Sequence, residues 1–150
     1  MITAQEIGQM PLFADLSQEQ LEVLAGLAEE KNFAEGEYLF KEGDSATHIF
    51  ILLEGKIGIQ VRLTSRPDSY TYTVLSQFGQ MVGWSGLVAP SHYTAAAVSQ
   101  MDSRLMAMDG QALMRAFEAD CHLGFTVMRR VTEVIGGRMR NIQRVVFKTL

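Results

Sequence analysis

A strictly alternating run of apolar and polar residues constrains the fold more than any other feature of the sequence. Between Lys56 and Leu63 the large apolar side chains occupy every second position, which places them together on one face of a β-strand. A predicted buried strand at residues 48–53, apolar throughout from 49 to 53, precedes it, and the intervening pair Glu54-Gly55 is typical of a turn. The sequence therefore predicts two successive strands, the first of them buried.

The same rhythm extends over residues 36–108. Stretches at 70–75, 93–99 and 103–108 have the composition of strands, and turn or loop segments are expected at 42–45 and 65–69. About six or seven short strands, spaced by roughly 8–12 residues, are typical of a sandwich or barrel. We expect an all-β core over residues 36–108.

Helical signals flank this region on both sides. Ser17 followed three residues later by Gln20 is a capping box, and a shorter helix is expected within residues 3–9. Asp109 is a favourable N-cap for the next helix, and the last helix is expected from Leu123 to the end. We expect helices over residues 3–30 and 109–150, within a single domain.

The last helix carries an apolar stripe. Its apolar positions repeat every 11 residues, which keeps them on one side of a nearly straight helix. The stripe can pack against the chain's own strands or against a second copy, and its length favours a homodimer. The residues expected at that interface are Met128, Val131, Ile135, Met139, Ile142 and Val146. Gly136-Gly137, within this helix, indicates either a kink or the close approach of a partner.

Charge is distributed unevenly. Residues 126–150 contain six basic residues and one acidic residue, whereas residues 1–125 contain seven and sixteen. A basic tail can bind nucleic acid, but the acidic body would repel phosphates, so we favour a solvated helix face and expect no direct nucleic-acid recognition. The single cysteine fits a reducing compartment, and we find neither a secretory signal nor a membrane-spanning run. We expect a cytoplasmic protein.

Searches for catalytic and metal-binding patterns find no candidate. The sequence has no glycine-rich phosphate loop ending in lysine, no paired-histidine zinc helix and no nucleophile elbow. The histidines at 48, 92 and 122 have no metal-ligand spacing with one another or with Cys121. We therefore expect no enzyme, no metal site and no resident cofactor.

One segment has a composition that suits ligand binding. Residues 78–97 contain three glycines within eight positions, and backbone N–H groups at the start of a turn over residues 85–88 could hold an anion. The alternative is a glycine-rich corner of a barrel with Trp84 in the core. Composition alone leaves both open.

Residues 12–148 resemble the cyclic-nucleotide-binding domain of the catabolite activator and of the regulatory subunits of cyclic-nucleotide-dependent kinases. The matching stretches are Leu12-Phe13 with Leu16-Ser17, then 36–40, 42–44, 49–52 and 54–57, and the glycine-rich segment stands where the family has its phosphate-binding cassette. The resemblance implies a mainly β fold, a double-stranded β-helix or β-roll of the jelly-roll kind, with N-terminal helices and a long C-terminal dimerisation helix. It also implies a ligand held between the cassette and that helix.

Two residues depart from the family pattern. After the glycine that corresponds to Gly83 the family usually has a glutamate that binds the ribose hydroxyl, and ten residues after it an arginine that pairs with the cyclic phosphate. Here these positions hold Trp84 and Tyr93, whereas Thr94 keeps a hydroxyl that is often present. Because a charge-assisted hydrogen bond contributes roughly 1.5–3 kcal/mol, we expect cyclic-nucleotide binding to be weakened by on the order of a thousandfold.

Two functions remain open. In the first, which we favour, the protein senses a non-standard small ligand, or a cyclic nucleotide only weakly, with Trp84 and Tyr93 as stacking walls. In the second, these rings fill the pocket and the protein is a dimeric scaffold. The volume left between residues 83–94 and the last helix distinguishes them. The expected ligand-binding residues are Gly83, Trp84, Ser85, Gly86, Leu87, Tyr93, Thr94, Ala95, Ile142 and Gln143.

The output of such a module is expected to pass through other chains. The family's transcription factors carry a DNA-binding domain after the long helix, and we expect none within these 150 residues. A downstream protein partner, or a rearrangement of helices between two protomers, would carry the signal.

Overall fold

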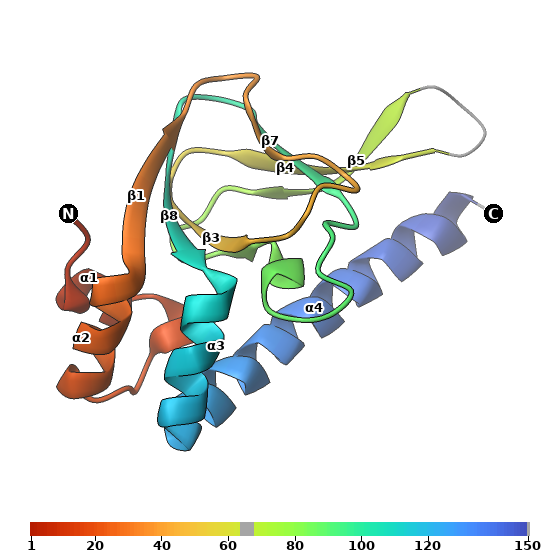
Figure 1. The fold of residues 1–150 in the computed structure, drawn as a ribbon. Helices are drawn as coiled ribbons and strands as arrows, with labels where there is room; N and C mark the ends of the chain where they lie inside the picture. The colour runs from red at the N-terminus through yellow and green to blue at the C-terminus, as the bar shows by residue number, and fades with distance from the viewer. Residues whose placement is uncertain (64–67, 150) are drawn as a thin grey trace.

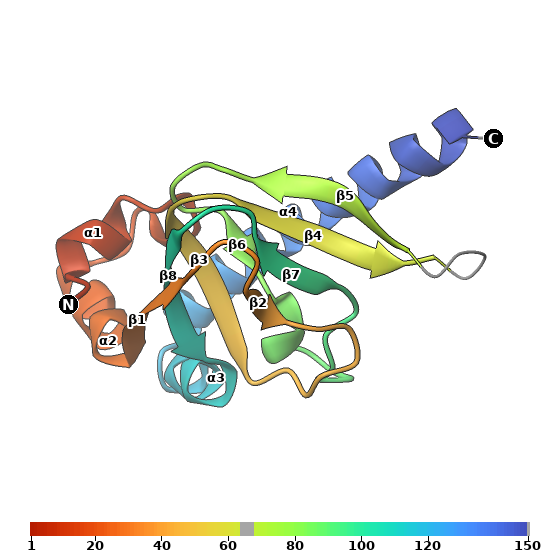
Figure 2. The same cartoon turned by 90° about the horizontal axis from the view of Figure 1, so that it is seen from above.

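A computed structural model of the chain describes residues 1–63 and 68–149. Two four-stranded antiparallel sheets, ordered β1-β8-β3-β6 and β2-β7-β4-β5, form a roll with helices packed against it (Figures 1 and 2). The strands are β1 (Ala28–Phe33), β2 (Tyr38–Phe40), β3 (His48–Glu54), β4 (Ile57–Arg62), β5 (Ser69–Leu75), β6 (Met81–Val82), β7 (Ala96–Ser99) and β8 (Ser103–Asp109). The helices are α1 (Ala4–Gly8), η1 (Pro11–Phe13), α2 (Gln18–Leu27), η2 (Trp84–Gly86), α3 (Gly110–Ala119) and α4 (Cys121–Thr149). The predicted mainly β fold with flanking helices and a long last helix is confirmed.

Strand β3 is buried on both faces. Ile49 and Ile51 point toward the helices, in one apolar cluster with Phe13 of η1. Phe50 and Leu52, at the alternate positions, belong to a second cluster inside the roll. This double burial explains why residues 49–53 form a continuous apolar run, whereas the sequence of the neighbouring β4 alternates between apolar and other residues.

The strands predicted at 48–53, at 70–75 and at 103–108 are confirmed to within one residue at each end. The strand predicted at 93–99 begins only at Ala96, because the backbone of Tyr93 pairs instead with Gly43 and Asp44. The loop expected at 65–69 lies mostly outside the described residues, as does Leu150.

The N-terminal helical region ends earlier than expected. The capping box is present, with the Ser17 hydroxyl accepting from the Gln20 N–H at 3.1 Å, but α2 stops at Leu27. Residues 28–33 were expected to be helical up to 30, and they form β1, which pairs with β8 along its whole length. The charged residues at 29–31 favour a helix locally, and the six-residue ladder overrides that preference. The roll therefore starts at Ala28 and not at 36.

Helix α4 begins on the core and ends away from it. Asp120 caps it, its carboxylate accepting from the Leu123 N–H at 3.1 Å, so the helix starts two residues earlier than expected. Val127 and Val131 are fully buried against the outer side of the β3 sheet, whereas the end of the helix extends past the roll (Figure 1). Within the described residues, none of the helices combines the length and the hydropathy that a bilayer-spanning segment needs.

Candidate functional site

The glycine-rich segment lies between β6 and β7, next to α4 (Figure 1). Gly83 has a left-handed φ of 89° and precedes the single turn η2. A Cβ on Gly83 would lie 3.2 Å from the carbonyl oxygen of His48 and 3.4 Å from ring carbons of Phe40 and Tyr93. Both the backbone conformation and this crowding require glycine, so the first cassette glycine is a structural requirement.

Two backbone amides at the end of η2 are used within the turn. The Gly86 N–H donates to the Gly83 carbonyl at 3.0 Å, and the Leu87 N–H donates to the Trp84 carbonyl at 2.9 Å. These two amides were expected to be free donors for a ligand, and they are not available in this structure. The Gly86 backbone also packs tightly, because a Cβ there would lie 2.8 Å from the His48 carbonyl oxygen.

Tyr93 is a core residue. Its ring stacks on that of Phe40, with centroids 3.7 Å apart and planes at 11°, and its hydroxyl donates to the His48 carbonyl at 2.7 Å. Only 6% of the residue is exposed, and burial raises the pKa of its hydroxyl. The position where the resemblance expects an arginine is therefore part of the inner apolar cluster.

The space beside the cassette is nearly filled. The cavity has a volume of only about 20 Å³. It is lined by Phe40, Ile59, Tyr72, Val82, Gly83, Trp84, Ser85, Tyr93, Thr94 and Ala95. Because a water molecule needs about 10–15 Å³ and ligand pockets typically measure roughly 300–1,000 Å³, this cavity has room for about one water and for no nucleotide.

The indole ring of Trp84 faces the guanidinium group of Arg138, which belongs to α4. The guanidinium carbon of Arg138 stands 5.7 Å from the centroid of the indole ring, within the range of a cation–π contact. Arg138 is only 9% exposed, and burial lowers its pKa to about 10, so the side chain is still charged at neutral pH. The last helix thus brings a buried positive charge to the cassette.

Arg138 and Asn141 also join α4 to the two sheets. Arg138 Nη2 donates to the Met81 carbonyl in β6, and Asn141 Nδ2 donates to the Tyr72 carbonyl in β5 at 3.1 Å. Both strands are edge strands of their sheets, and edge carbonyls need partners. One turn of helix therefore caps the edges of both sheets beside the cassette.

Of the predicted ligand residues, those in the segment 83–95 come together, and those on the last helix do not join them. Six of the eight predicted segment residues line the cavity, and Gly86 and Leu87 do not. Ile142 and Gln143 are exposed and take no part in it. Arg138 and Asn141 were missed. The signal for them was the line Val127, Val131, Val134 at steps of four and three, which continues to 138 and 141 on the buried face of the helix.

The predicted dimer stripe divides into two parts. Val131 is fully buried, and Met128 and Ile135 pack partly against the same core, so the protein's own roll covers this half. Val131 therefore has no surface to offer to a second copy. Met139, Ile142 and Val146 are 58%, 38% and 47% exposed, respectively. The dimer interface stays a prediction for this outer half alone.

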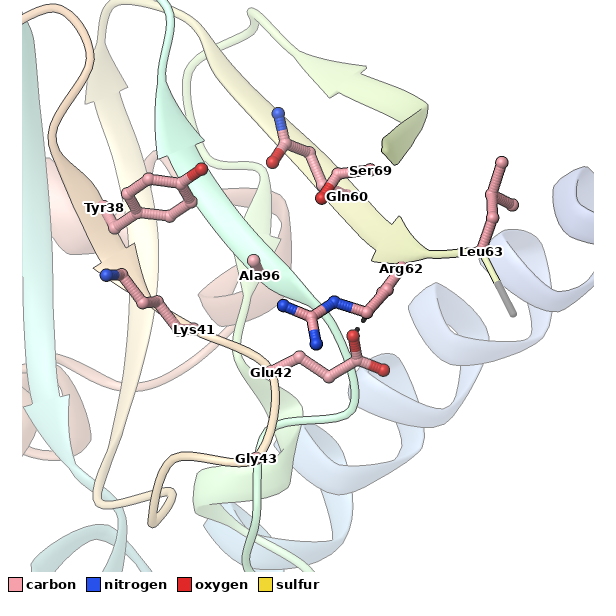
Figure 3. Close-up of a pocket in the computed structure, with 9 residues that line it drawn as sticks. All are labelled: Tyr38, Lys41, Glu42, Gly43, Gln60, Arg62, Leu63, Ser69 and Ala96. Carbon is pink, nitrogen blue, oxygen red and sulfur yellow. Dashed lines mark hydrogen bonds between the residues drawn. The ribbon is translucent and has the colours of Figure 1, made fainter. Parts of the chain in front are cut away.

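A larger hollow lies on the outer side of the β2-β7-β4-β5 sheet (Figure 3). It measures about 630 Å³, and Lys41, Glu42 and Arg62 stand around it. These side chains are exposed, Lys41 lies over the Tyr38 ring at 5.2 Å, and Glu42 accepts from the Arg62 N–H at 3.4 Å. Its polar groups are solvated on the sheet surface, and we assign no site to it.

The structure has a β-roll with a turn between β6 and β7 that begins at Gly83, and a long helix lies beside that turn. The family model described as "Cyclic nucleotide-binding domain" matches residues 30–120, which is more than half of the chain. The chain belongs to this family. As a cyclic nucleotide-binding domain it has the family's roll and turn, with a tyrosine in the core where the resemblance expects the phosphate-binding arginine.

Solved structures agree with this assignment. A candidate cyclic nucleotide-binding protein from Geobacter metallireducens GS-15 is 30% identical, with a TM-score of 0.77 over 93% of this chain and 99% of that one. The catabolite activator protein of Thermus thermophilus is 16% identical, with a TM-score of 0.75 over 91% of this chain and 63% of that one. A regulatory subunit of a cAMP-independent protein kinase A from Trypanosoma cruzi, bound to guanosine, is 18% identical, with a TM-score of 0.71 over 87% and 44%. The comparison with curated proteins finds no match.

Proposed function

We propose that this domain is a non-catalytic regulatory module whose nucleotide site is occupied by its own side chains and which acts through contacts with other chains. The observation that carries the proposal is the cavity of about 20 Å³, with the Tyr93 ring stacked on Phe40 at the position where the resemblance expects the phosphate-binding arginine. Of the two functions that the sequence left open, this is the second, in which the rings of Trp84 and Tyr93 fill the pocket. Family membership supports a regulatory role and not an enzymatic one.

Charge supports the same conclusion. The cyclic phosphate of a nucleotide carries a full negative charge, and a buried anion needs a charged or multiply donating partner. The segment 83–95 contains no arginine or lysine, and Tyr93 already donates its proton to the protein's own backbone. Cyclic AMP or cyclic GMP would therefore have to displace core side chains, and the segment 83–95 itself would supply no arginine or lysine to its phosphate.

The outer half of α4 is the proposed contact with other chains. Met139, Ile142 and Val146 recur at steps of three and four and are exposed on one face of a helix that extends past the roll (Figure 2). Pairing of this face with a second copy would bury it, and a downstream protein partner would bind the dimer. We also propose a cytoplasmic location, because the single cysteine is a free thiol.

Titration calorimetry tests the closed site. We expect no saturable heat from cyclic AMP, cyclic GMP or guanosine at ligand concentrations up to about the millimolar range. Guanosine is included because the Trypanosoma cruzi regulatory subunit binds it and because an uncharged nucleoside needs no arginine. Micromolar binding of any of the three by the unaltered protein would falsify the proposal.

Two variants distinguish the effect of opening space in the nucleotide site from the effect of adding charge to it. The double variant Trp84→Glu/Tyr93→Arg restores both groups that the family uses, and we expect it to bind cyclic AMP at least tenfold more tightly than the parent. The matched control Tyr93→Ala opens space without adding a cation and should gain much less. Melting temperature with and without the nucleotide shows whether each variant is folded and whether the ligand stabilises it.

A further inference from the structure

A groove separate from the cassette cavity lies between η1, the turn after β5, β6 and α4. It measures about 640 Å³, which is within the usual range for small-molecule sites, and it shares no lining residue with the cassette cavity. The lining residues are Pro11, Leu12, Thr73, Leu75, Gln77, Phe78, Gly79, Gln80, Met81, Arg130, Glu133, Val134, Gly137, Arg138 and Asn141. Unlike the hollow on the outer sheet face, this groove has a buried charge in its wall.

That charge is on Arg138, and it lacks a complete set of partners. Nη2 donates to the Met81 carbonyl, but Nη1 is buried and has no acceptor within residues 1–63 and 68–149. Over the same residues Arg138 forms no ion pair with a carboxylate. A buried donor without an acceptor, on a cation without a counter-charge, is costly to the folded protein. An anion beside Arg138 would remove both deficits.

The other charged groups of the groove are already engaged. Arg130 donates to the carbonyls of Leu12 and Ala14, and its Nη2 lies 3.6 Å from a carboxylate oxygen of Asp15. Glu133 also lines the groove, and its carboxylate lies 3.9 Å from the guanidinium of Arg129, which does not line it. Arg138 is thus the cation in the groove wall with a donor to spare, and no acid of the described chain neutralises it.

The uncharged part of the lining is mixed, with polar groups from Thr73, Gln77, Gln80 and Asn141 beside apolar ones. Leu75 and Val134 line the wall, and Phe78 is 43% exposed at its edge. Gly137 leaves the helix surface without a side chain, since an added Cβ would meet only one atom, Arg140 Nη2 at 3.9 Å. A ligand for this shape has an apolar body, which covers the exposed ring of Phe78, and one anionic end, which reaches Arg138.

We propose that the groove between η1, the 76–80 turn and α4 binds an amphipathic anion, a carboxylate or phosphate monoester on an apolar chain, with Arg138 as the group that binds its charge. Such a ligand would compete with the Trp84 ring for the same guanidinium. The groove would then be a regulatory input to the module, distinct from the nucleotide site.

Sodium octanoate and octyl phosphate are the probes for the two head groups, with octanol as the uncharged control. Trp84 is the single tryptophan, so its fluorescence reports a change at Arg138 directly. We expect both anions to give saturable changes in fluorescence and to shift the ¹⁵N–¹H signals of residues 75–81 and 133–141. Octanol should bind at least about tenfold more weakly. The tighter of the two anions identifies the head group.

Two variants test the groove itself. Arg138→Met keeps an apolar stem and removes the charge, and we expect it to weaken binding by about tenfold or more, as seen in the amide shifts. Gly137→Leu fills the groove while the helix remains intact, and it should abolish binding. The matched control Arg140→Gln removes an exposed arginine of the same helix and should change affinity less than about twofold.

Three results would overturn the proposal. They are the absence of saturable shifts up to tens of millimolar probe, shifts concentrated outside the groove, and undiminished binding by a folded Arg138→Met or Gly137→Leu. Because the groove and the cassette share no lining residue, these outcomes leave the calorimetric test of the nucleotide site unaffected.

Discussion

The phenol ring of Tyr93 lies parallel to the ring of Phe40, 3.7 Å from it, and hydrogen bonds the His48 carbonyl at 2.7 Å. This pair joins the end of the cassette segment to β2 and β3. The resemblance places residue 93 in contact with ligand, but in this structure Tyr93 helps to stabilise the roll.

We expect Tyr93 variants to separate the contributions of the ring and the hydroxyl. Tyr93→Phe should lower the free energy of unfolding by about 1 kcal/mol, because the His48 carbonyl loses a donor. Tyr93→Ala should cost roughly 3–5 kcal/mol, because it also leaves a cavity. Urea denaturation measures both. Tyr38→Phe, at an exposed position, is the control, and an equal loss there would count against the core role of Tyr93.

Stability should fall at alkaline pH because of buried phenols. Burial raises the pKa of Tyr93 and of Tyr72 above the ordinary value of 10.0. The folded state therefore holds these protons more tightly than the unfolded state. The resulting stabilisation is fully present below about pH 10 and is lost as the pH rises through the folded-state values.

Absorbance at 295 nm as a function of pH measures the ionisation, and thermal melts over the same range measure the stability. Tyr93→Phe should remove one high-pKa step and flatten the loss of stability. An unchanged titration curve in that variant would show that Tyr93 ionises as in water.

The outer stripe of α4 predicts a homodimer that one charge can disrupt. Ile142→Asp places a carboxylate in the proposed apolar interface, and we expect it to shift the protein from dimer to monomer in light scattering coupled to size-exclusion chromatography. Thr132→Asp introduces the same charge at an exposed position of the same helix and should leave the dimer intact. A parent protein that is monomeric at high concentration would exclude this interface.

Two glycines should respond to alanine in opposite directions. Gly137→Ala meets only Arg140 Nη2, at 3.9 Å, and should raise stability by about 1 kcal/mol through helix propensity. A Cβ on Gly110 would overlap the carbonyl oxygen of Gly86, so Gly110→Ala should destabilise the fold strongly. Thermal denaturation distinguishes the two, and tolerance of Gly110→Ala would show that the contact can relax.

Short-range patterns predicted much of the fold. The alternating sequence of β4, the apolar run of β3 and the capping box at Ser17 each depend on neighbours within a few residues, and the structure has both strands and the cap. Strand β1 could not be predicted in this way. Residues 29–31 are charged, and their strand conformation depends on pairing with β8, more than 70 positions away.

In the candidate site, too, some features could be predicted from the sequence and others could not. The departures at Trp84 and Tyr93 were visible in the sequence, but whether the rings line a pocket or fill it depends on Phe40 and on the His48 carbonyl. Arg138 was overlooked because an arginine in a basic helix usually lies in solvent. Its burial follows from the approach of Met81 and Trp84 to one turn of α4, which only the folded chain reveals.

The contact between Gly86 and Gly110 has a mechanical consequence. The cassette turn and the first residue of α3 are in backbone contact, with no room for a Cβ on Gly110, so a shift of the turn toward α3 would press on the start of that helix. Only Asp120 stands between α3 and α4, and a displacement of the turn would change the angle at that joint. Because Arg138 and Asn141 bind carbonyls of β6 and β5, the outer half of α4 could follow such a change only if these two hydrogen bonds broke, and the exposed end of the helix would then move relative to the roll.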